Sequence, residues 1–315
     1  MYSDRRSPCI VRDVKLSRVL CDILMLAVAI LPLPIFHFGV TPFQRGFYCD
    51  DDSIRYPYKA HERVNNGSLY SIIFVPPLIL IILVEAYRIY DEKRSFGPRP
   101  RCISHSIFGK LIIPPYISRL YVFIGYYLLG LAFVLAFTEI GMYTIGRLRP
   151  HFIDACKPKW PGNICPYQPH VYITNITCTG DRGEVKEARI SFPSGHSSTA
   201  SYAMIYVVIY LEARGYSWGS KLLRPLIQLG FLSIAVYTAL SRVADYWHHP
   251  TDVLAGSVIG VIVALVVCFR VIPFHRFPWL KPTVEFSAST VHPRNDGDIV
   301  QYVKSPRKHT EDIGR

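Results

Sequence analysis

Apolar residues along this chain gather into six long runs separated by polar stretches. The runs cover residues 19–40, 69–89, 120–140, 197–212, 225–240 and 251–271. Most are close to the length, about 20 residues, that a helix needs to cross the hydrocarbon core of a bilayer. Helices in the core of a soluble protein rarely run this long without a polar face. The pattern therefore predicts an all-α, polytopic membrane protein, built as a six-transmembrane-helix bundle.

Basic residues assign the two ends of this bundle to the two sides of the membrane. They crowd the N-terminus, the loop after the second run, the loop after the fourth run and the tail. With six spans these segments share one side, which the positive-inside rule makes cytoplasmic. We therefore expect a cytoplasmic N-terminus (1–18), a six-span domain (19–272) with an extracellular cap loop at about 150–193, and a flexible cytoplasmic tail (273–315).

The composition favours a membrane surface over a nucleic acid as the partner of the positive charge. The net charge is +12, and half of the residues are hydrophobic. No basic stripe alternates with exposed aromatic residues on a soluble domain, so we predict no nucleic-acid binding. The first apolar run follows a basic stretch and is too long for the apolar part of a signal peptide, which favours a signal anchor.

Sequons and cysteines fall on the side opposite the basic loops. The sequons at Asn66 and Asn175 lie in the first and third loops and predict glycosylation there. Four of the eight cysteines lie in the same loops: Cys49, Cys156, Cys165 and Cys178. Disulfides persist outside the cytoplasm, so at least one bridge is expected within the third loop, with the pairing left open.

Proline and glycine predict how the helices pack. Pro32 and Pro34 in the first run, and the pair at 76–77 in the second, should kink their helices. Neighbouring helices would then satisfy the freed carbonyl groups. Gly256 and Gly260, one helical turn apart in the last run, predict a close approach to another helix.

Polar residues recur at four ends of the runs, and alternation places all four ends on the extracellular side. The positions are Arg149, then Ser194, Gly195 and His196, then Arg242, and finally His248 and Asp252. Each has a structural explanation when taken alone. Ser194 is a good helix N-cap, and the carboxylate of Asp252 near a helix start suits the helix dipole. Hydrophobic folding does not explain why all of them gather at one rim.

Together these residues predict a phosphate site. A helix start at Ser194 and Gly195 offers free N–H groups to an anion, and glycine lets a phosphate approach the backbone. Arg149 and Arg242 add permanently charged, forked donors that match phosphate oxygens.

The same cluster predicts a nucleophile and a proton carrier. His248 and Asp252 are four residues apart on one helix face, where Asp252 can keep one imidazole nitrogen protonated and the other free to attack. His196 can protonate the departing alkoxide and later activate water. No acidic cluster suits Mg²⁺ and no Cys/His spacing suits Zn²⁺, so no metal and no cofactor are expected. The arginines and the helix end would stabilise the transition state.

Three segments carry a resemblance to a known family: 146–152 (GRLRPHF), 192–198 (FPSGHSS) and 241–252 (SRVADYWHHPTD). They resemble the signature motifs of the type 2 phosphatidic acid phosphatases, or lipid phosphate phosphatases. The similarity runs from the first span to the last, and in wider detail the chain looks like a member of the insect Wunen branch.

The resemblance implies Mg²⁺-independent dephosphorylation of lysophosphatidate, phosphatidate, sphingosine 1-phosphate and similar lipids at an extracellular site. It implies a phosphohistidine on His248, an acid/base at His196, and phosphate binding by Arg149, Ser194, Gly195 and Arg242. The expected partners are lipid phosphates and membrane lipids, and the expected location is the plasma membrane. The oligomeric state is left open, a homo-oligomer included.

One position departs from the family pattern. The first motif of the family begins with a lysine seven residues before Arg149, and Met142 stands there. The lost charged contact predicts weaker transition-state binding by about 1.5–3 kcal/mol, roughly 10- to 150-fold in rate. Glu139, one turn earlier, loses an ion-pair partner, and Arg147 on a continuing helix would point away from the face of Met142. We therefore expect an attenuated enzyme or one with altered preference.

Two other functions remain as alternatives. A non-catalytic lipid-phosphate-binding or scaffolding membrane protein would have Met142 as its first loss. A transporter would use Asp22, Glu85 or Glu139, since intramembrane acids often mark ion paths. Asp22 and Glu85 lie near predicted cytoplasmic ends, where water reaches them, and paired broken helices are missing. The sequence favours the enzyme.

Overall fold

The computed structural model of the chain describes residues 10–14, 16–96, 103–107, 111–160, 165, 170–214 and 221–272. All of these belong to one compact unit, Met1–Lys281, and a second unit, Pro282–Arg315, contains none of them. The predicted tail from residue 273 therefore lies outside the described residues, as do the first nine residues of the predicted N-terminal segment.

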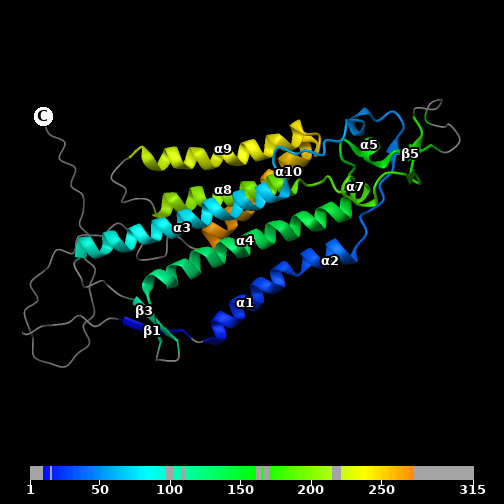
Figure 1. The fold of residues 1–315 in the computed structure, drawn as a ribbon. Helices are drawn as coiled ribbons and strands as arrows, with labels where there is room; N and C mark the ends of the chain where they lie inside the picture. The colour runs from blue at the N-terminus through cyan, green and yellow to red at the C-terminus, as the bar shows by residue number, and fades with distance from the viewer. Residues whose placement is uncertain are drawn as a thin grey trace, which may run out of the picture. The chain divides into compact units, whose positions relative to one another are not determined.

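Long helices dominate the described part of the first unit (Figure 1). They are α1 (Leu16–Ile30), α2 (Pro32–Gly39), α3 (Asn66–Phe96), α4 (Pro115–Ile145), α8 (Gly195–Arg214), α9 (Leu223–Ala244) and α10 (Pro250–Val266), which continues into the π-helical segment η3 (Val267–Val271). Five segments among the described residues are long and apolar enough to cross a membrane: Leu16–Gly39, Asn66–Glu92, Pro115–Ile145, Leu223–Ala244 and Pro250–Val271. The predicted helical membrane bundle is confirmed in this form.

The helix at the place of the fourth predicted span, α8, is not among the five. Its first half contains three serines and a threonine, which lower its hydropathy, and most of its side chains are buried. It packs against α3, α4, α9 and α10. A helix that is surrounded by protein does not need an apolar surface toward lipid. The membrane crossing by α8, and with it the total of six spans, stays a prediction.

Tyrosine hydroxyl groups satisfy backbone carbonyls inside the bundle. Pro77 has no N–H to donate to the carbonyl of Ile73, four residues earlier in α3. The hydroxyl of Tyr127, on α4, donates to this carbonyl. Tyr202, on α8, donates to the carbonyl of Tyr127 at 2.8 Å. The expectation that a neighbouring helix satisfies carbonyls freed by proline is confirmed at Ile73.

Two glycines bring α10 directly against the backbone of α8. A Cβ atom at Gly256 would collide with the carbonyl oxygen of Ser194, and one at Gly260 with that of Ser198. The predicted close packing is confirmed. Because the contacts begin at the first residues of α8, they fix the start of this helix beside the first turns of α10.

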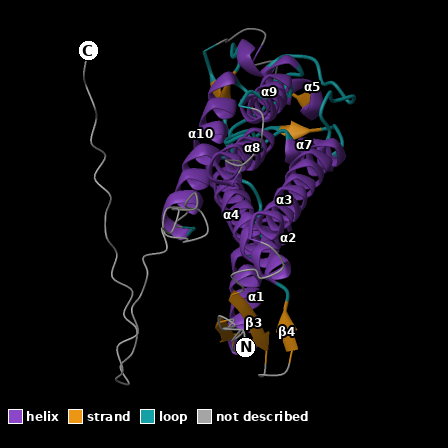
Figure 2. Ribbon diagram, turned by 90° about the vertical axis from the view of Figure 1, so that its left-hand side faces the viewer, coloured by secondary structure: helices purple, strands orange, loops and turns teal. Residues whose placement is uncertain are grey.

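Short strands lie at the two ends of the helices (Figure 2). One sheet has the order β1 (Ile10–Val14), β3 (Ile103–Ile107) and β4 (Leu111–Ile113), with β1 parallel to β3 and β3 antiparallel to β4. The sequence pattern predicted no strand in these segments.

The other strands belong to the cap at the opposite end. There β2 (Phe47–Tyr48) pairs with β6 (Tyr172–Ile173), and β5 (Pro158–Lys159) pairs with β7 (Thr177–Cys178). The cap also holds the one-turn helix η1 (Asp52–Ile54) and the short helices α5 (Phe152–Cys156) and α7 (Arg182–Glu187) (Figure 1). It has a small core of its own, formed by Phe47, Ile54, Leu148, Phe152, Ala155, Cys156 and Ala188.

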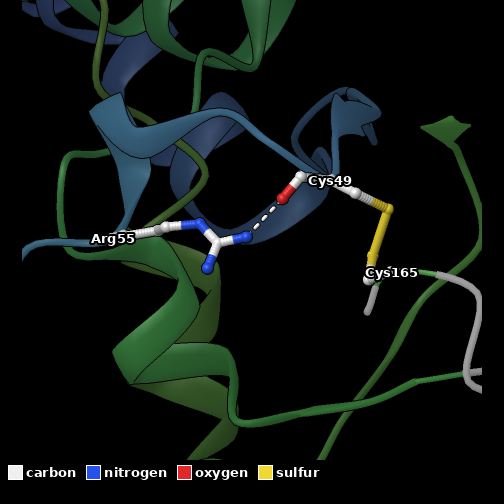
Figure 3. Close-up of a disulfide and its surroundings, with 3 residues drawn as sticks. All are labelled: Cys49, Arg55 and Cys165. Carbon is white, nitrogen blue, oxygen red and sulfur yellow. Dashed lines mark hydrogen bonds between the residues drawn. A yellow bond between two sulfur atoms is a disulfide. The ribbon is translucent and has the colours of Figure 1, made fainter. Parts of the chain in front are cut away.

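Two disulfides hold the cap. Cys156–Cys178 closes within the third loop, as predicted, and Cys49–Cys165 joins the first loop to the third. Figure 3 shows Cys49–Cys165 beside a hydrogen bond that Arg55 donates to the carbonyl oxygen of Cys49. All four cysteines that the sequence placed on one side of the membrane are therefore paired.

Glu85 forms a buried ion pair between α3 and α8. Its carboxylate accepts from Nε and Nη2 of Arg214 at 2.8 and 2.6 Å and from the hydroxyl of Tyr210 at 2.8 Å. The sequence analysis expected water to reach Glu85, which was wrong: both charged side chains are fully buried. A paired, dehydrated carboxylate gives no support to an ion path at this residue.

We expect Glu85→Ala to destabilise the bundle by about 3–5 kcal/mol, because it leaves the charge of Arg214 buried and unpaired. The control is Glu212→Ala, whose pair with Arg224 spans 3.3 Å and whose side chain is 60% exposed; it should change the stability by less than about 1 kcal/mol. Thermal unfolding in detergent micelles measures both. Equal shifts in Tm for the two variants would contradict this assignment.

Candidate active site

The four predicted polar clusters meet at the cap end of the bundle. Arg149 follows the end of α4, Arg242 lies in the last turn of α9, and α8 and α10 both begin there. Backbone hydrogen bonds join the pieces: the amide of Ser194 donates to the carbonyl of Asp252 at 3.0 Å, and the amide of His248 donates to that of Arg242 at 3.3 Å. The convergence that the alternation of spans predicted is present.

His248 lies between α9 and α10 with its ring buried. Its Nδ1 is 2.7 Å from the carbonyl oxygen of Ser191. A carbonyl can only accept, so Nδ1 carries the proton and Nε2 holds the free electron pair. The protein thus fixes this imidazole in the tautomer that a nucleophile at Nε2 requires.

Asp252 does not provide this hydrogen bond, which corrects the sequence analysis. Its carboxylate turns back toward the start of α10, where Oδ2 accepts from the amide of His249 at 3.1 Å in a capping box. Oδ2 also accepts from the hydroxyl of Ser191 at 2.6 Å. Asp252 therefore acts on His248 through Ser191, a residue that no sequence signal had identified.

Arg147 is the other partner of Asp252. The helix α4 ends at Ile145, and Gly146 takes a left-handed conformation with φ of 57°, so Arg147 lies beyond the helix. Its Nη1 is 2.5 Å from Oδ1 of Asp252. Arg147 is already engaged there, which supports the expectation that it does not replace the missing lysine at position 142.

The two predicted phosphate-binding arginines are both buried. Nη1 of Arg242 donates to Glu62 at 2.6 Å, and Nη1 of Arg149 lies 3.6 Å from a carboxylate oxygen of Glu187. The guanidinium of Arg149 also lies over the ring of Trp247, 4.7 Å from its centroid.

Several buried side-chain nitrogens at this place have no hydrogen-bond partner within the described part of the chain. They are Nε and Nη1 of Arg149, Nη2 of Arg242, Nε2 of His196 and Nε1 of Trp247. Buried polar atoms are nearly always satisfied in folded proteins, and each orphaned one costs free energy. The four arginine and tryptophan nitrogens are donors, so together they can bind an oxyanion.

Ser194 and Gly195 form the start of α8, where the amide of Ser194 departs from the prediction. The hydroxyl of Ser194 caps the helix, accepting from the amide of Ser197 at 3.4 Å, and its own amide is bonded to Asp252. The amide of Ser194 is therefore not free for phosphate. Helix geometry leaves the amides of Gly195 and His196 without an acceptor inside α8, so these two remain for an anion.

Met142 lies beside this helix start. A Cβ atom on Gly195 would be 3.2 Å from Cε of Met142 and 3.5 Å from a methyl group of Thr138. Position 142 therefore faces the start of α8, where Gly195 and His196 form the proposed phosphate cradle. A lysine at this position could reach a bound phosphate, and the thioether cannot. This geometry is consistent with the predicted loss of one charged contact.

The charges of the arginines act on the nucleophile candidate. Burial lowers the pKa of His248 well below its ordinary value, and the nearby positive charge of Arg149 lowers it further, with smaller effects of His196 and Arg242. Burial also lowers the pKa of Arg149, which Glu187 and Glu62 oppose. An arginine stays protonated under these conditions, so the site combines fixed positive charge with a neutral imidazole.

The remaining predicted positions lie outside this cluster. Asn66 is the first residue of α3, Asn175 lies in the cap, and both are exposed. Among the described residues, no group of three or more His, Cys, Asp or Glu side chains could hold a metal ion.

Comparisons with known proteins agree with the family that the sequence motifs resemble. The model of the PAP2 superfamily matches residues 123–276. A Drosophila melanogaster protein that bears the name of a phosphatidate phosphatase is 41% identical over 289 residues, which cover 88% of this chain and 75% of that protein. Phospholipid phosphatase 1 of Rattus norvegicus is 37% identical over 88% of this chain and 93% of its own length. Phospholipid phosphatase 2 of Homo sapiens is 38% identical over 80% and 82%. No solved structure matches the chain.

Proposed function

The chain belongs to the PAP2 superfamily, and we propose that it is an integral membrane phosphatase of lipid phosphate monoesters. Its substrates would be lysophosphatidate, phosphatidate, sphingosine 1-phosphate or lipids of the same kind. The names of its relatives support the enzyme class. The observation that carries the proposal is the set of buried, unpartnered nitrogens on Arg149, Arg242 and His196, next to an imidazole held in its Nε2-nucleophilic tautomer.

A phosphate monoester fits this set by charge and by geometry. Arg149 can present Nε and Nη1 to the oxygens, Arg242 can present Nη2, and the amides of Gly195 and His196 add the dipole end of a helix. Burial strengthens these interactions, because water competes less for the donors. The Nε1 donor of Trp247 is a further candidate contact that the sequence motifs did not reveal.

The first chemical step would be the attack of Nε2 of His248 on the phosphorus atom. The N–P bond forms as the ester P–O bond breaks, and the leaving oxygen takes the electron pair together with a proton from His196. Arg149, Arg242 and the helix start would stabilise the charge on the three remaining oxygens in place of a metal ion.

The second step would release the phosphate. His196, now neutral, takes a proton from water as the water oxygen attacks the phosphorus, and the N–P bond to His248 breaks. The products are inorganic phosphate, which leaves into water, and a neutral or less charged lipid, which stays in the bilayer.

The apolar helices support residence in a membrane. Two disulfides and two exposed sequons at the end that holds the site support an extracellular or lumenal face for the reaction, with both termini in the cytoplasm. We propose the plasma membrane as the location.

A non-catalytic protein that binds lipid phosphate is the second candidate. Met142 favours it, because the apolar side chain lies at the phosphate cradle where the family has a lysine. The hydrogen bond that fixes the tautomer of His248 favours the enzyme. A protein that only binds lipid phosphate does not need an imidazole whose Nε2 is kept free to attack.

Replacement of His248 should abolish turnover. We expect His248→Ala to lower release of inorganic phosphate from lysophosphatidate micelles by about 10⁴-fold, with EDTA present throughout. No acid-labile ³²P label should remain on the protein. His170→Ala, which removes an 87% exposed histidine of the cap, is the control and should keep full activity. Unchanged release by the His248 variant would exclude it as the nucleophile.

The lowered pKa of His248 sets the pH dependence. The reactive form of His248 is neutral, so the loss that this residue causes comes as pH falls through its lowered pKa; the need for a protonated His196 adds a separate loss toward high pH. We expect the acid limb of kcat/KM, corrected for the second ionisation of the substrate phosphate, to lie below pH ~6.5. Arg149→Gln removes the charge that lowers the pKa of His248 most, so the acid limb of its residual activity should lie at higher pH. A wild-type limb at or above ~6.5 would contradict the burial of this imidazole.

Restoring the lysine should raise the rate. We expect Met142→Lys to increase kcat/KM by about tenfold, because the ammonium group would gain a contact with the phosphate in the transition state. Met142→Leu, which keeps an apolar side chain of similar volume, should leave the rate nearly unchanged. Binding of lipid phosphate without turnover by both the wild type and Met142→Lys would instead favour the non-catalytic protein.

A further inference from the structure

One contact of the site comes from a loop that holds none of the three signature motifs. Glu62 lies in the loop before α3, and its Oε2 accepts from Nη1 of Arg242 at 2.6 Å. The side chain of Arg242 is 1% exposed and that of Glu62 is 15% exposed. A charge-assisted hydrogen bond of this length in a buried place holds both groups firmly.

The backbone around Glu62 is itself anchored to the site. The amide of Arg63 donates to Oδ2 of Asp245 at 3.0 Å, at the end of α9. Val64, two residues after Glu62, is buried. Glu62 therefore projects from a segment that is bonded to the end of α9 and packed into the protein at Val64.

This contact decides which donors Arg242 has left. Nε is 3.4 Å from the hydroxyl of Ser241, Nη1 is bonded to Glu62, and Nη2 has no hydrogen-bond partner. Nη2 forms a longer ion pair with a carboxylate oxygen of Asp245, at 3.9 Å. The guanidinium is planar and rigid, so holding Nη1 and Nε fixes the direction of Nη2.

We propose that Glu62 is a positioning residue that aims Nη2 of Arg242 at the phosphate. The inference rests on the proposed function for the identity of the anion. Glu62 acts through Arg242 and does not touch the substrate. Its carboxylate also offsets the charge of a buried guanidinium whose other ion-pair partner, Asp245, lies 3.9 Å from Nη2.

Glu62 could instead compete with the phosphate for Arg242. Its removal would then strengthen phosphate binding, the opposite of the effect expected for a positioning residue. The positioning role predicts weaker binding when the acceptor for Nη1 is lost and nearly unchanged binding when a neutral acceptor replaces it.

Binding of inorganic phosphate to the full chain in detergent, followed by ³¹P NMR line broadening, separates these roles. We expect Glu62→Ala to raise the Kd for phosphate by about tenfold and to lower kcat/KM for lysophosphatidate in parallel. Glu62→Gln keeps an oxygen that can accept from Nη1 and should stay within about threefold of the wild type. Asp52→Ala removes a 95% exposed carboxylate from the same loop and should change neither quantity.

A double-mutant cycle shows whether the effect passes through Arg242. In an Arg242→Ala background, Glu62→Ala should cause no further loss of phosphate binding. An equal loss in both backgrounds would overturn the proposal, because Glu62 would then act on the fold. Tighter phosphate binding by Glu62→Ala would also overturn it and assign a competing role.

Two further outcomes keep the test decisive. Glu62→Asp keeps the charge but shortens the reach, so it should weaken phosphate binding more than Glu62→Gln; the reverse order contradicts positioning even if Glu62→Ala fails to fold. If the wild type binds phosphate with the expected dependence on Glu62 but releases none from any lipid phosphate, the proposed function fails while the role of Glu62 stands.

Discussion

The close contact between α8 and α10 is the constraint on which the site depends. The carbonyl oxygen of Ser194 occupies the space that a side chain on Gly256 would fill, and the amide of Ser194 is bonded to the carbonyl of Asp252. His196 lies in the first turn of α8, and His248 lies two residues before α10. Two small residues inside a membrane helix therefore bring a candidate acid/base and a candidate nucleophile to the same place. Larger residues there would separate the helix starts before they altered any functional side chain.

Arg214 and Arg149 are both buried, but the protein pairs their charges differently. Arg214 is bonded through Nε and Nη2 to one carboxylate, with only Nη1 left without a partner. Within the described residues, Arg149 pairs with a carboxylate oxygen of Glu187 at 3.6 Å, beyond a normal hydrogen bond, and lies over the ring of Trp247. Its Nε and Nη1 have no hydrogen-bond partner there. The first arrangement joins α3 to α8. The second leaves a buried guanidinium with donors that a phosphate would complete. The cap and the helices hold it in this position.

The sequence predicted the parts of this molecule that rest on strong local signals. Long apolar runs located the helices, and polar residues at their ends located the site. It was less informative about α8, since hydropathy measures suitability for lipid and α8 is surrounded by protein. The strands β1, β3 and β4 had no pattern that separated them from loops.

Contacts inside the site were the least predictable from the sequence. The spacing of His248 and Asp252 suggested a direct hydrogen bond, because residues four apart share a helix face. His248 precedes α10, however, and the carboxylate of Asp252 accepts from the amide of the N-cap residue His249, so the carbonyl of Ser191 takes the place at Nδ1. Glu62 could not have been found at all, because 180 residues separate it from Arg242 and its loop holds none of the three signature motifs.

Orientation, more than net charge, is what this site offers to a phosphate. Arg149 and Arg242 are each accompanied by a carboxylate, Glu187 and Glu62, so the cluster carries little excess positive charge before a ligand binds. Met142 removes the further cation that the family motif would supply. A dianion must then be bound chiefly by donors that already point at it, since net attraction is weak and water is excluded. In such a site a residue that aims a guanidinium would contribute to catalysis nearly as directly as the guanidinium itself, and this is the role that we propose for Glu62.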